Sequence, residues 1–147
     1  MTKQVTGIAP QSLIQFAAAA YQDLGMPFDD ALLAADSLVQ ADLWGHQSHG
    51  LLRLAWYCAR LRSGAMRAVT KTEVMVDAGA ICVLEGHDGV GQVIAKQAVD
   101  ESCRRAKAHG VGIVSVRNSN HFGTCMYFSR MGAAQGCITM IMSNAGP

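Results

Sequence analysis

The residues whose types and spacing most clearly suggest chemistry lie in one short stretch, residues 45–54. If a helix begins at Ser48, its hydroxyl can cap the first turn, and His49 and Arg53 then lie four residues apart on one face. An imidazole can give or take a proton near neutral pH, and a guanidinium can hold a carboxylate through two hydrogen bonds. This pair suits a reaction on a small acid whose neighbouring carbon changes oxidation state. By spacing alone, however, an exposed helix start with a surface histidine and arginine is the more common arrangement.

A second group of polar residues forms the turn 118–123, which contains Asn120, His121 and Gly123. It follows a predicted buried strand over 111–116 and leads into a predicted helix. Amide groups at a helix N-terminus favour anionic or polar ligands, so the turn could form part of a site. Asparagine and serine are also ordinary capping residues. The residues of the turn therefore leave a binding site and a simple connection equally open.

The glycine-rich stretch 86–91 has the pattern G-x-x-G-x-G between a predicted strand and a predicted helix. A dinucleotide fold has G-x-G-x-x-G instead, with an acidic residue roughly 20 positions later. That later region holds Arg117 and no carboxylate. We therefore expect a glycine turn in which Asp88 helps to cap the next helix, and a half-Rossmann nucleotide binder is the less favoured alternative. His46 and His49 are spaced as H-x-x-H, but no third ligand follows at a recognisable spacing, so no metal site is predicted.

Hydrophobic periodicity predicts the elements that must position these residues. Helical spacing places one apolar face on Leu13, Phe16, Ala17, Ala20, Tyr21 and Leu24. The predicted elements are helices over 11–24, 29–43 and 48–63, a hairpin of strands over 72–77 and 81–84, a helix ending at His109, a strand over 111–116, a helix over 124–135 and a buried strand over 137–142. This order predicts an α/β (α+β) protein, with a three-helix unit over 1–66 followed by a mixed α/β sheet layer over 67–147.

The composition argues against several classes of partner. Of the 147 residues, 50% are hydrophobic and 16% are charged, and the net charge is +1. We therefore expect no nucleic-acid and no membrane partner, since the chain has neither a basic excess nor an apolar run of roughly 20 residues. The five cysteines are odd in number and scattered, which is typical of reduced thiols. Because no signal-peptide pattern is present either, we expect a cytoplasmic protein.

The final residues, 143–147, begin a polar turn directly after a predicted strand. In open α/β sheets the functional crevice lies at the carboxyl ends of the strands. We therefore expect a fragment or a truncated product, with an incomplete sheet domain over 67–147.

Residues 41–54, ADLWGHQSHGLLRL, followed by Tyr57 and Arg60, resemble the signature of the malate/L-lactate dehydrogenase type 2 family. Three later segments resemble further parts of this family in the same order, namely residues 86–93, 119–123 and 133–144. The resemblance covers essentially the whole chain, as the N-terminal portion of a family member. It implies the non-Rossmann fold of a family of NAD(P)-dependent oxidoreductases.

The resemblance also implies roles for individual residues. The catalytic residues would be His49 as general acid and base, Arg53 holding the substrate carboxylate, and Ser48 and His121 lining the pocket. The residues approaching NAD or NADP would be Asn120, Gly123, Ser143 and Asn144. The implied reaction is hydride transfer between the nicotinamide and a small 2-hydroxy or 2-keto acid, in a homodimer. For a truncated chain the isolated activity is doubtful, so a non-catalytic module that binds a small anion or assembles with other chains is the alternative. The choice of acid, the choice between NAD and NADP, and the direction of reaction stay open.

Overall fold

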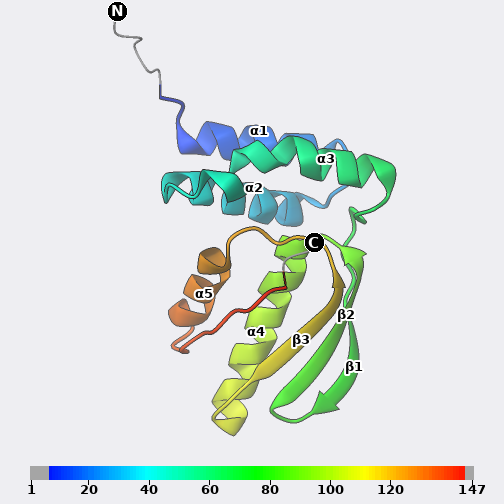
Figure 1. Ribbon diagram of the computed structural model, residues 1–147, viewed down its shortest axis with the longest axis vertical. Coiled ribbons are helices and arrows are strands. Elements are labelled where there is room, and N and C mark those ends of the chain that lie inside the picture. Colours follow the sequence, from blue (N-terminus) through cyan, green and yellow to red (C-terminus); the bar gives the residue numbers. More distant parts are fainter. Residues whose placement is uncertain (1–6, 145–147) are drawn as a thin grey trace, which may run out of the picture.

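Three helices form the first layer of the fold and lie side by side above the rest of the chain (Figure 1). The computed structural model describes residues 7–144. The elements of this layer are α1 (Pro10–Gln22), α2 (Phe28–Leu43) and α3 (Leu54–Ser63), with two 3₁₀ turns, η1 (Gln47–His49) and η2 (Leu51–Arg53), between α2 and α3. The final part of the predicted polar turn, 145–147, lies outside the described residues.

Small residues line the contact between α1 and α2. The fixed backbone of Pro10 suits the first turn of α1, and Gly25 follows the helix in a left-handed conformation with φ +88°. Around the buried Tyr21 and Leu38, the packed residues are mostly alanines: Ala17, Ala18, Ala31, Ala34 and Ala35. The expectation that Phe16 is buried is wrong, because its side chain is 64% exposed. The buried stripe runs instead through the smaller side chains next to it, which let the two helices approach closely.

The core of this helical layer extends into the second half of the chain. Tyr57 and Met66 pack in the same cluster as Val90 and Val93, which lie at the start of α4 (Gly91–His109). The division into units at residue 66 stays a prediction, and the two parts share apolar packing.

A mixed three-stranded sheet occupies the second half, and α4 packs on it (Figure 1). The strands β1 (Glu73–Ala78) and β2 (Ile81–Gly89) form an antiparallel hairpin, whereas β2 and β3 (Ile113–Ser119) are parallel, in the order β1-β2-β3. A parallel pair needs a crossover connection, and α4 provides it. The last helix, α5 (Cys125–Ala134), packs against α4. The predicted α/β class is confirmed.

The predicted glycine turn at 86–91 is wrong, because β2 continues to Gly89. His87 and Asp88 adopt left-handed conformations, with φ 48° and 57°, and the pairing of β2 with β3 is irregular beyond Glu85. The stretch is therefore a bulge within a strand. Asp88 does not cap α4 either, since Val90 is the N-cap and no side chain bonds to the helix start.

Glycines in this stretch allow another part of the backbone to approach closely. A Cβ on Gly91 would lie 2.2 Å from the carbonyl oxygen of Asn120, and one on Gly86 would lie 2.8 Å from that of Asn118. Gly91 therefore lets the segment after β3 lie on the start of α4, and Gly86 lets the end of β3 approach β2 closely. That segment is also less of a turn than predicted, since β3 runs to Ser119.

Residues 137–142, predicted as a buried strand, do not form a strand in the structure. The segment does alternate: Cys137 and Ile141 pack against α4 and α5, whereas Ile138, Met140 and Met142 are 106%, 81% and 82% exposed. Alternation is a local property, but a strand also needs a neighbour whose amide and carbonyl groups pair with its own. None of the described strands pairs with this segment. The structure also contains no helix, among the described residues, that is long and apolar enough to cross a membrane.

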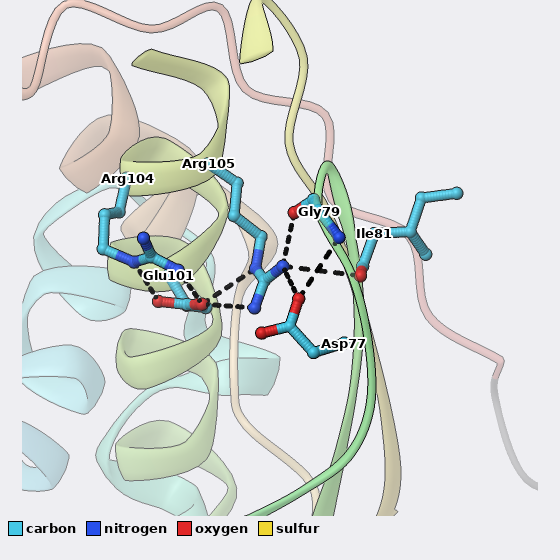
Figure 2. Close-up of polar contacts among 6 residues, drawn as sticks. All are labelled: Asp77, Gly79, Ile81, Glu101, Arg104 and Arg105. Atoms are coloured by element: carbon cyan, nitrogen blue, oxygen red, sulfur yellow. Dashed lines mark hydrogen bonds and ion pairs between the residues drawn. The ribbon is translucent and has the colours of Figure 1, made fainter. Parts of the chain in front are cut away.

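Arg105 on α4 connects the β1–β2 hairpin to the helix through hydrogen bonds (Figure 2). Its side chain is 2% exposed and donates to Oδ1 of Asp77 over 2.6 Å and to Oε1 of Glu101 over 2.8 Å, as well as to backbone carbonyls of the hairpin. Hydrogen bonding from Arg105 lowers the pKa of Asp77 to about 2. Arg104 and then Arg105 lower the pKa of Glu101 to about 2.

We expect Arg105→Ala to lower the midpoint of thermal unfolding by on the order of 5–10 °C, because two carboxylates and the hairpin carbonyls lose a shared buried donor. Arg104→Ala is the matched control, since Arg104 is 63% exposed and bonds only to Glu101 among the described residues. Its midpoint should fall by no more than about 2 °C. Equal losses in the two variants, measured by circular dichroism, would contradict the role of Arg105.

The same pair of variants tests how the stability contributed by these ion pairs depends on pH. Because folding depresses the pKa of Asp77 and Glu101, their stabilising contribution is present above the ordinary pKa of a carboxyl group, about 4. It is lost as the pH falls through about 2. The stability difference between the wild type and Arg105→Ala should therefore shrink between about pH 5 and pH 2.

Candidate active site

Residues 45–54 fold as two short 3₁₀ turns and not as the start of one helix. Ser48 does not cap a helix, because its hydroxyl lies 3.0 Å from Nδ1 of His49 and η1 has no side-chain cap. His49 and Arg53 therefore do not share a helix face. Instead Nε of Arg53 donates to the carbonyl oxygen of Ser48 over 2.8 Å, which folds the guanidinium back over the first turn.

The break between the turns is set by Asp42 at the end of α2. One carboxylate oxygen of Asp42 accepts a hydrogen bond from the amide of Leu51 over 2.8 Å. Gly50 lies between the turns with an extended backbone, and a Cβ there would lie 1.9 Å from Oδ1 of Asp42. The glycine after His49 is thus required by the carboxylate that anchors the second turn.

We expect Gly50→Ala to lower the free energy of unfolding by about 1–3 kcal/mol, the usual cost of forcing an extra methyl group into a packed site. The new methyl group would displace Asp42 from Leu51 and so move His49. Chemical denaturation measures the loss of stability, and Gly7→Ala is the control, since its Cβ would meet nothing within 4 Å. An unchanged unfolding midpoint for Gly50→Ala would show that Asp42 does not hold the turn.

The structure brings together histidines that are far apart in the sequence. The rings of His49 in η1 and His121 after β3 are stacked, with centroids 5.4 Å apart and planes 28° apart. The ring of His46 lies 4.2 Å from that of His49, and Nδ1 of His46 lies 3.2 Å from the hydroxyl of Thr124. The two predicted catalytic histidines therefore face one shared region.

Arg53 lies close enough to both rings to affect their protonation. Burial, followed by the neighbouring His46 and Arg53, lowers the pKa of His49. Burial, followed by His49 and Arg53, lowers the pKa of His121. Both rings are therefore neutral at pH 7, and Arg53 carries the positive charge of the cluster. No described residue accepts a hydrogen bond from the Nη groups of Arg53, so they can bind a carboxylate.

Trp56 supports this arrangement from the first turn of α3. The guanidinium carbons of Arg53 and Arg60 lie 5.8 Å and 5.2 Å from the centre of its ring, and its edge meets the ring of His121 at 5.7 Å. Cation–π contact of this kind restricts an arginine without using its hydrogen-bond donors. Trp56 is 39% exposed, so it forms a wall of the candidate site.

Asn120 is not part of the cluster. Its side-chain oxygen accepts from Nε and Nη2 of Arg60 over 2.9 Å and 2.6 Å. Its side-chain nitrogen donates to the carbonyl oxygens of Asp88 and Gly89 over 2.7 Å and 3.1 Å. The amide is thus fully used in joining α3 to the end of β2, and it keeps no free group for a cofactor.

The other predicted cofactor residues are not gathered into one pocket. Gly123 lies beside His121, with φ +86° and its amide 3.2 Å from Nδ1 of that ring. Ser143 and Asn144 are exposed at the end of the described chain, and no hydrogen bond within residues 7–144 connects them to the cluster.

Two surface cavities, of 490 Å³ and 360 Å³, lie elsewhere among the described residues, and neither is lined by residues of the cluster. The described residues also contain no group of three histidine, cysteine, aspartate or glutamate side chains that could hold a metal ion. The cluster is polar and partly exposed, and its charged group is the guanidinium of Arg53, which suits a small anion better than a cation.

Comparison with known proteins identifies the family. The sequence pattern of malate/L-lactate dehydrogenases matches residues 8–147. The chain belongs to the malate/L-lactate dehydrogenase family. The resemblance noted in the sequence is confirmed, and it includes both turns that carry the histidines.

Relatives in this family include a malate dehydrogenase from Pyrococcus horikoshii, 37% identical over 92% of this chain and 38% of the relative. The solved structure of that enzyme superposes with a TM-score of 0.87 over 89% of this chain and 38% of its own. An L-sulfolactate dehydrogenase from Methanocaldococcus jannaschii is 37% identical over 84% of this chain and 36% of its own, and a sulfolactate dehydrogenase structure from the same organism superposes with a TM-score of 0.84. The chain thus spans less than two-fifths of the length of these relatives.

Three residues of the candidate site were not assigned a role from the sequence. Asp42, Trp56 and Tyr57 touch or support the cluster. Tyr57 lies within the motif that resembles the family, which was the one available signal for it. Asp42 also lies within that motif, at residues 41–54, whereas Trp56 carries no such signal.

Proposed function

We propose that this chain forms the acid-binding and proton-transferring part of an NAD(P)-dependent oxidoreductase that acts on small 2-hydroxy and 2-keto acids. The observation that carries the proposal is the stacking of His49 and His121 beside a guanidinium with free Nη groups. The names of the relatives, malate and sulfolactate dehydrogenases, support the same class of acid. We also propose that the protein is cytoplasmic and forms a homodimer.

Arg53 would hold the carboxylate of the acid through its two Nη groups. The carbonyl or hydroxyl group on the neighbouring carbon would then lie toward His49 and His121. During reduction of a 2-keto acid, the carbonyl oxygen needs a proton, and His49 supplies it as general acid. In the oxidation of a 2-hydroxy acid, neutral His49 accepts the proton from the hydroxyl group.

A bound nicotinamide would supply or accept the hydride in this chemistry. The described residues fit the acid better than they fit the cofactor. Asn120 is saturated by protein groups, and Ser143 and Asn144 are not connected to the cluster. The cofactor role of these residues, and of Gly123, stays a prediction.

The proposal is tested by mixing the protein with NADH or NADPH and with oxaloacetate or pyruvate, while following nicotinamide fluorescence. We expect oxidation of the nucleotide that requires the keto acid. A control reaction with a simple monocarboxylate, acetate, should leave the nucleotide unchanged, because acetate has no keto group to accept the hydride.

A second candidate is a module that binds a small acid without a redox reaction. The saturated amide of Asn120 and the open surface of the cluster favour it. Saturable binding of malate with no oxidation of NADH or NADPH would support this candidate. Absence of both acid binding and nucleotide oxidation would contradict both candidates.

A further inference from the structure

Tyr57 connects the core of the helical layer to the candidate active site. It lies on α3, its side chain is 1% exposed, and its ring packs in the same apolar cluster as Tyr21. Its hydroxyl, however, lies 2.6 Å from Nδ1 of His121. A buried tyrosine hydroxyl normally finds a hydrogen-bond partner, and here that partner is a predicted catalytic residue.

The direction of this hydrogen bond follows from the second group on the same nitrogen. The backbone amide of Gly123 lies 3.2 Å from Nδ1 of His121, and a backbone amide can only donate. Nδ1 must therefore present its lone pair. Burial raises the pKa of Tyr57, so its hydroxyl keeps its proton and can donate as well. With two donors directed at Nδ1, the neutral ring carries its own proton on Nε2.

Gln92, in the first turn of α4, lies close to the hydroxyl of Tyr57. Its side chain is 1% exposed, and neither polar atom of its amide forms a hydrogen bond of regular geometry with a described residue. The amide nevertheless partly opposes the effect of burial on the pKa of Tyr57. The amide of Gln92 and the ring of His121 therefore both lie next to this hydroxyl.

We propose that Tyr57 is a positioning residue that holds His121 in the tautomer with its proton on Nε2. This inference rests on the proposed function for its consequence. His121 would donate a hydrogen bond through Nε2 to an oxygen of the acid, while His49 transfers the proton. Tyr57 does not touch the acid itself, and its effect passes through the orientation and tautomer of one ring. The two stacked histidines would then have different tasks, one as a fixed donor and one as the acid and base.

Long-range proton–nitrogen NMR spectra of protein labelled with ¹⁵N-histidine test the assignment, because they show which ring nitrogen carries the proton. At a pH where the rings are neutral, we expect the wild-type His121 to carry its proton on Nε2. In Tyr57→Phe, which removes only the hydroxyl, we expect a mixture of the two tautomers, because the shorter of the two hydrogen bonds to Nδ1 is lost.

Tyr21→Phe is the matched control. Tyr21 is also 1% exposed in the same core, and its hydroxyl has no hydrogen-bond partner among the described residues. This variant should leave the His121 spectrum unchanged. A wild-type His121 with its proton on Nδ1 would overturn the proposal, whether or not Tyr57→Phe folds. An unchanged tautomer in a folded Tyr57→Phe protein would overturn it as well.

Kinetic measurements separate positioning from a general structural effect. If the protein reduces a 2-keto acid, Tyr57→Phe should lower kcat about tenfold, the factor for one neutral hydrogen bond, and change KM little. Tyr21→Phe should change neither constant. The tautomer of His121 could change in Tyr57→Phe while the wild type binds no acid. This result would support the effect of Tyr57 on the tautomer of His121 and would contradict the proposed function. The two proposals can therefore fail separately.

Discussion

Replacement of His49 by alanine is expected to lower the turnover of a 2-keto acid by at least ~100-fold, the usual contribution of a general acid. The ring of His49 is placed by the turn that Asp42 and Gly50 hold, and it stacks on His121 beside Arg53. The remaining residues would still bind the acid, but no group would deliver the proton to the carbonyl oxygen. The loss should therefore appear mainly in kcat.

His109→Ala is the control for this variant, because His109 lies exposed in the last turn of α4, where Gly110 ends the helix. Its turnover should equal that of the wild type. Turnover of His49→Ala within a few-fold of the wild type would remove His49 from the role of general acid.

The rates of reduction and of oxidation should depend on pH in opposite directions. Reduction needs protonated His49, whose pKa lies below its ordinary value of 6.5, so the rate should fall as the pH rises through that lowered pKa. Oxidation of a 2-hydroxy acid needs the neutral ring, so its rate should hold at pH 6.5 and decline only at a lower pH. His49→Ala should remove both dependences from the residual rate. A rate profile that is the same in the two directions would contradict the assignment.

Replacement of Arg53 by glutamine is expected to raise the KM for the acid at least ~30-fold, since removal of one partner of a close charge pair costs about 2 kcal/mol or more. The Nη groups of Arg53 have no acceptor among residues 7–144, so a carboxylate can occupy both. Arg53→Lys keeps the charge but loses the planar fork and the contact with Trp56. It should fall between the wild type and Arg53→Gln.

Arg62→Gln is the matched control, because Arg62 lies exposed on the following helix α3, away from the cluster. Its KM should be unchanged. Equal KM values for Arg53→Gln and Arg62→Gln would show that the guanidinium of Arg53 does not hold the acid.

Local patterns in the sequence were enough to predict most of the elements. The periodic apolar residues of α1 and α2, the glycine that follows each helix, and the β1–β2 hairpin are properties of short stretches. Three features could not be predicted in this way. The two 3₁₀ turns depend on Asp42 reaching the amide of Leu51, and the bulge in β2 depends on the backbone of the segment after β3. The apolar alternation at 137–142 predicts a strand, but alternation does not supply the neighbouring strand.

The candidate site could also be predicted only in part. The motif that contains His49 and Arg53 and the motif that contains His121 could be recognised separately in the sequence. That their rings stack could not be predicted, because it requires the segment after β3 to lie close against Gly91 at the start of α4. Tyr57 belongs to the apolar core by its type and burial, and only its contact with His121 shows a link to the site.

The central claim is that His49, His121 and Arg53 form one binding site for a small 2-hydroxy acid. The most direct test is a titration of the protein with malate, followed through the ring signals of its five histidines in proton–carbon NMR spectra. We expect the signals of His49 and His121 to shift together with one dissociation constant and those of His87 and His109 not to move, and we expect Arg53→Gln to abolish the shifts. Saturable shifts confined to His87 or His109, or no shift of His49 and His121 at millimolar malate, would contradict this claim.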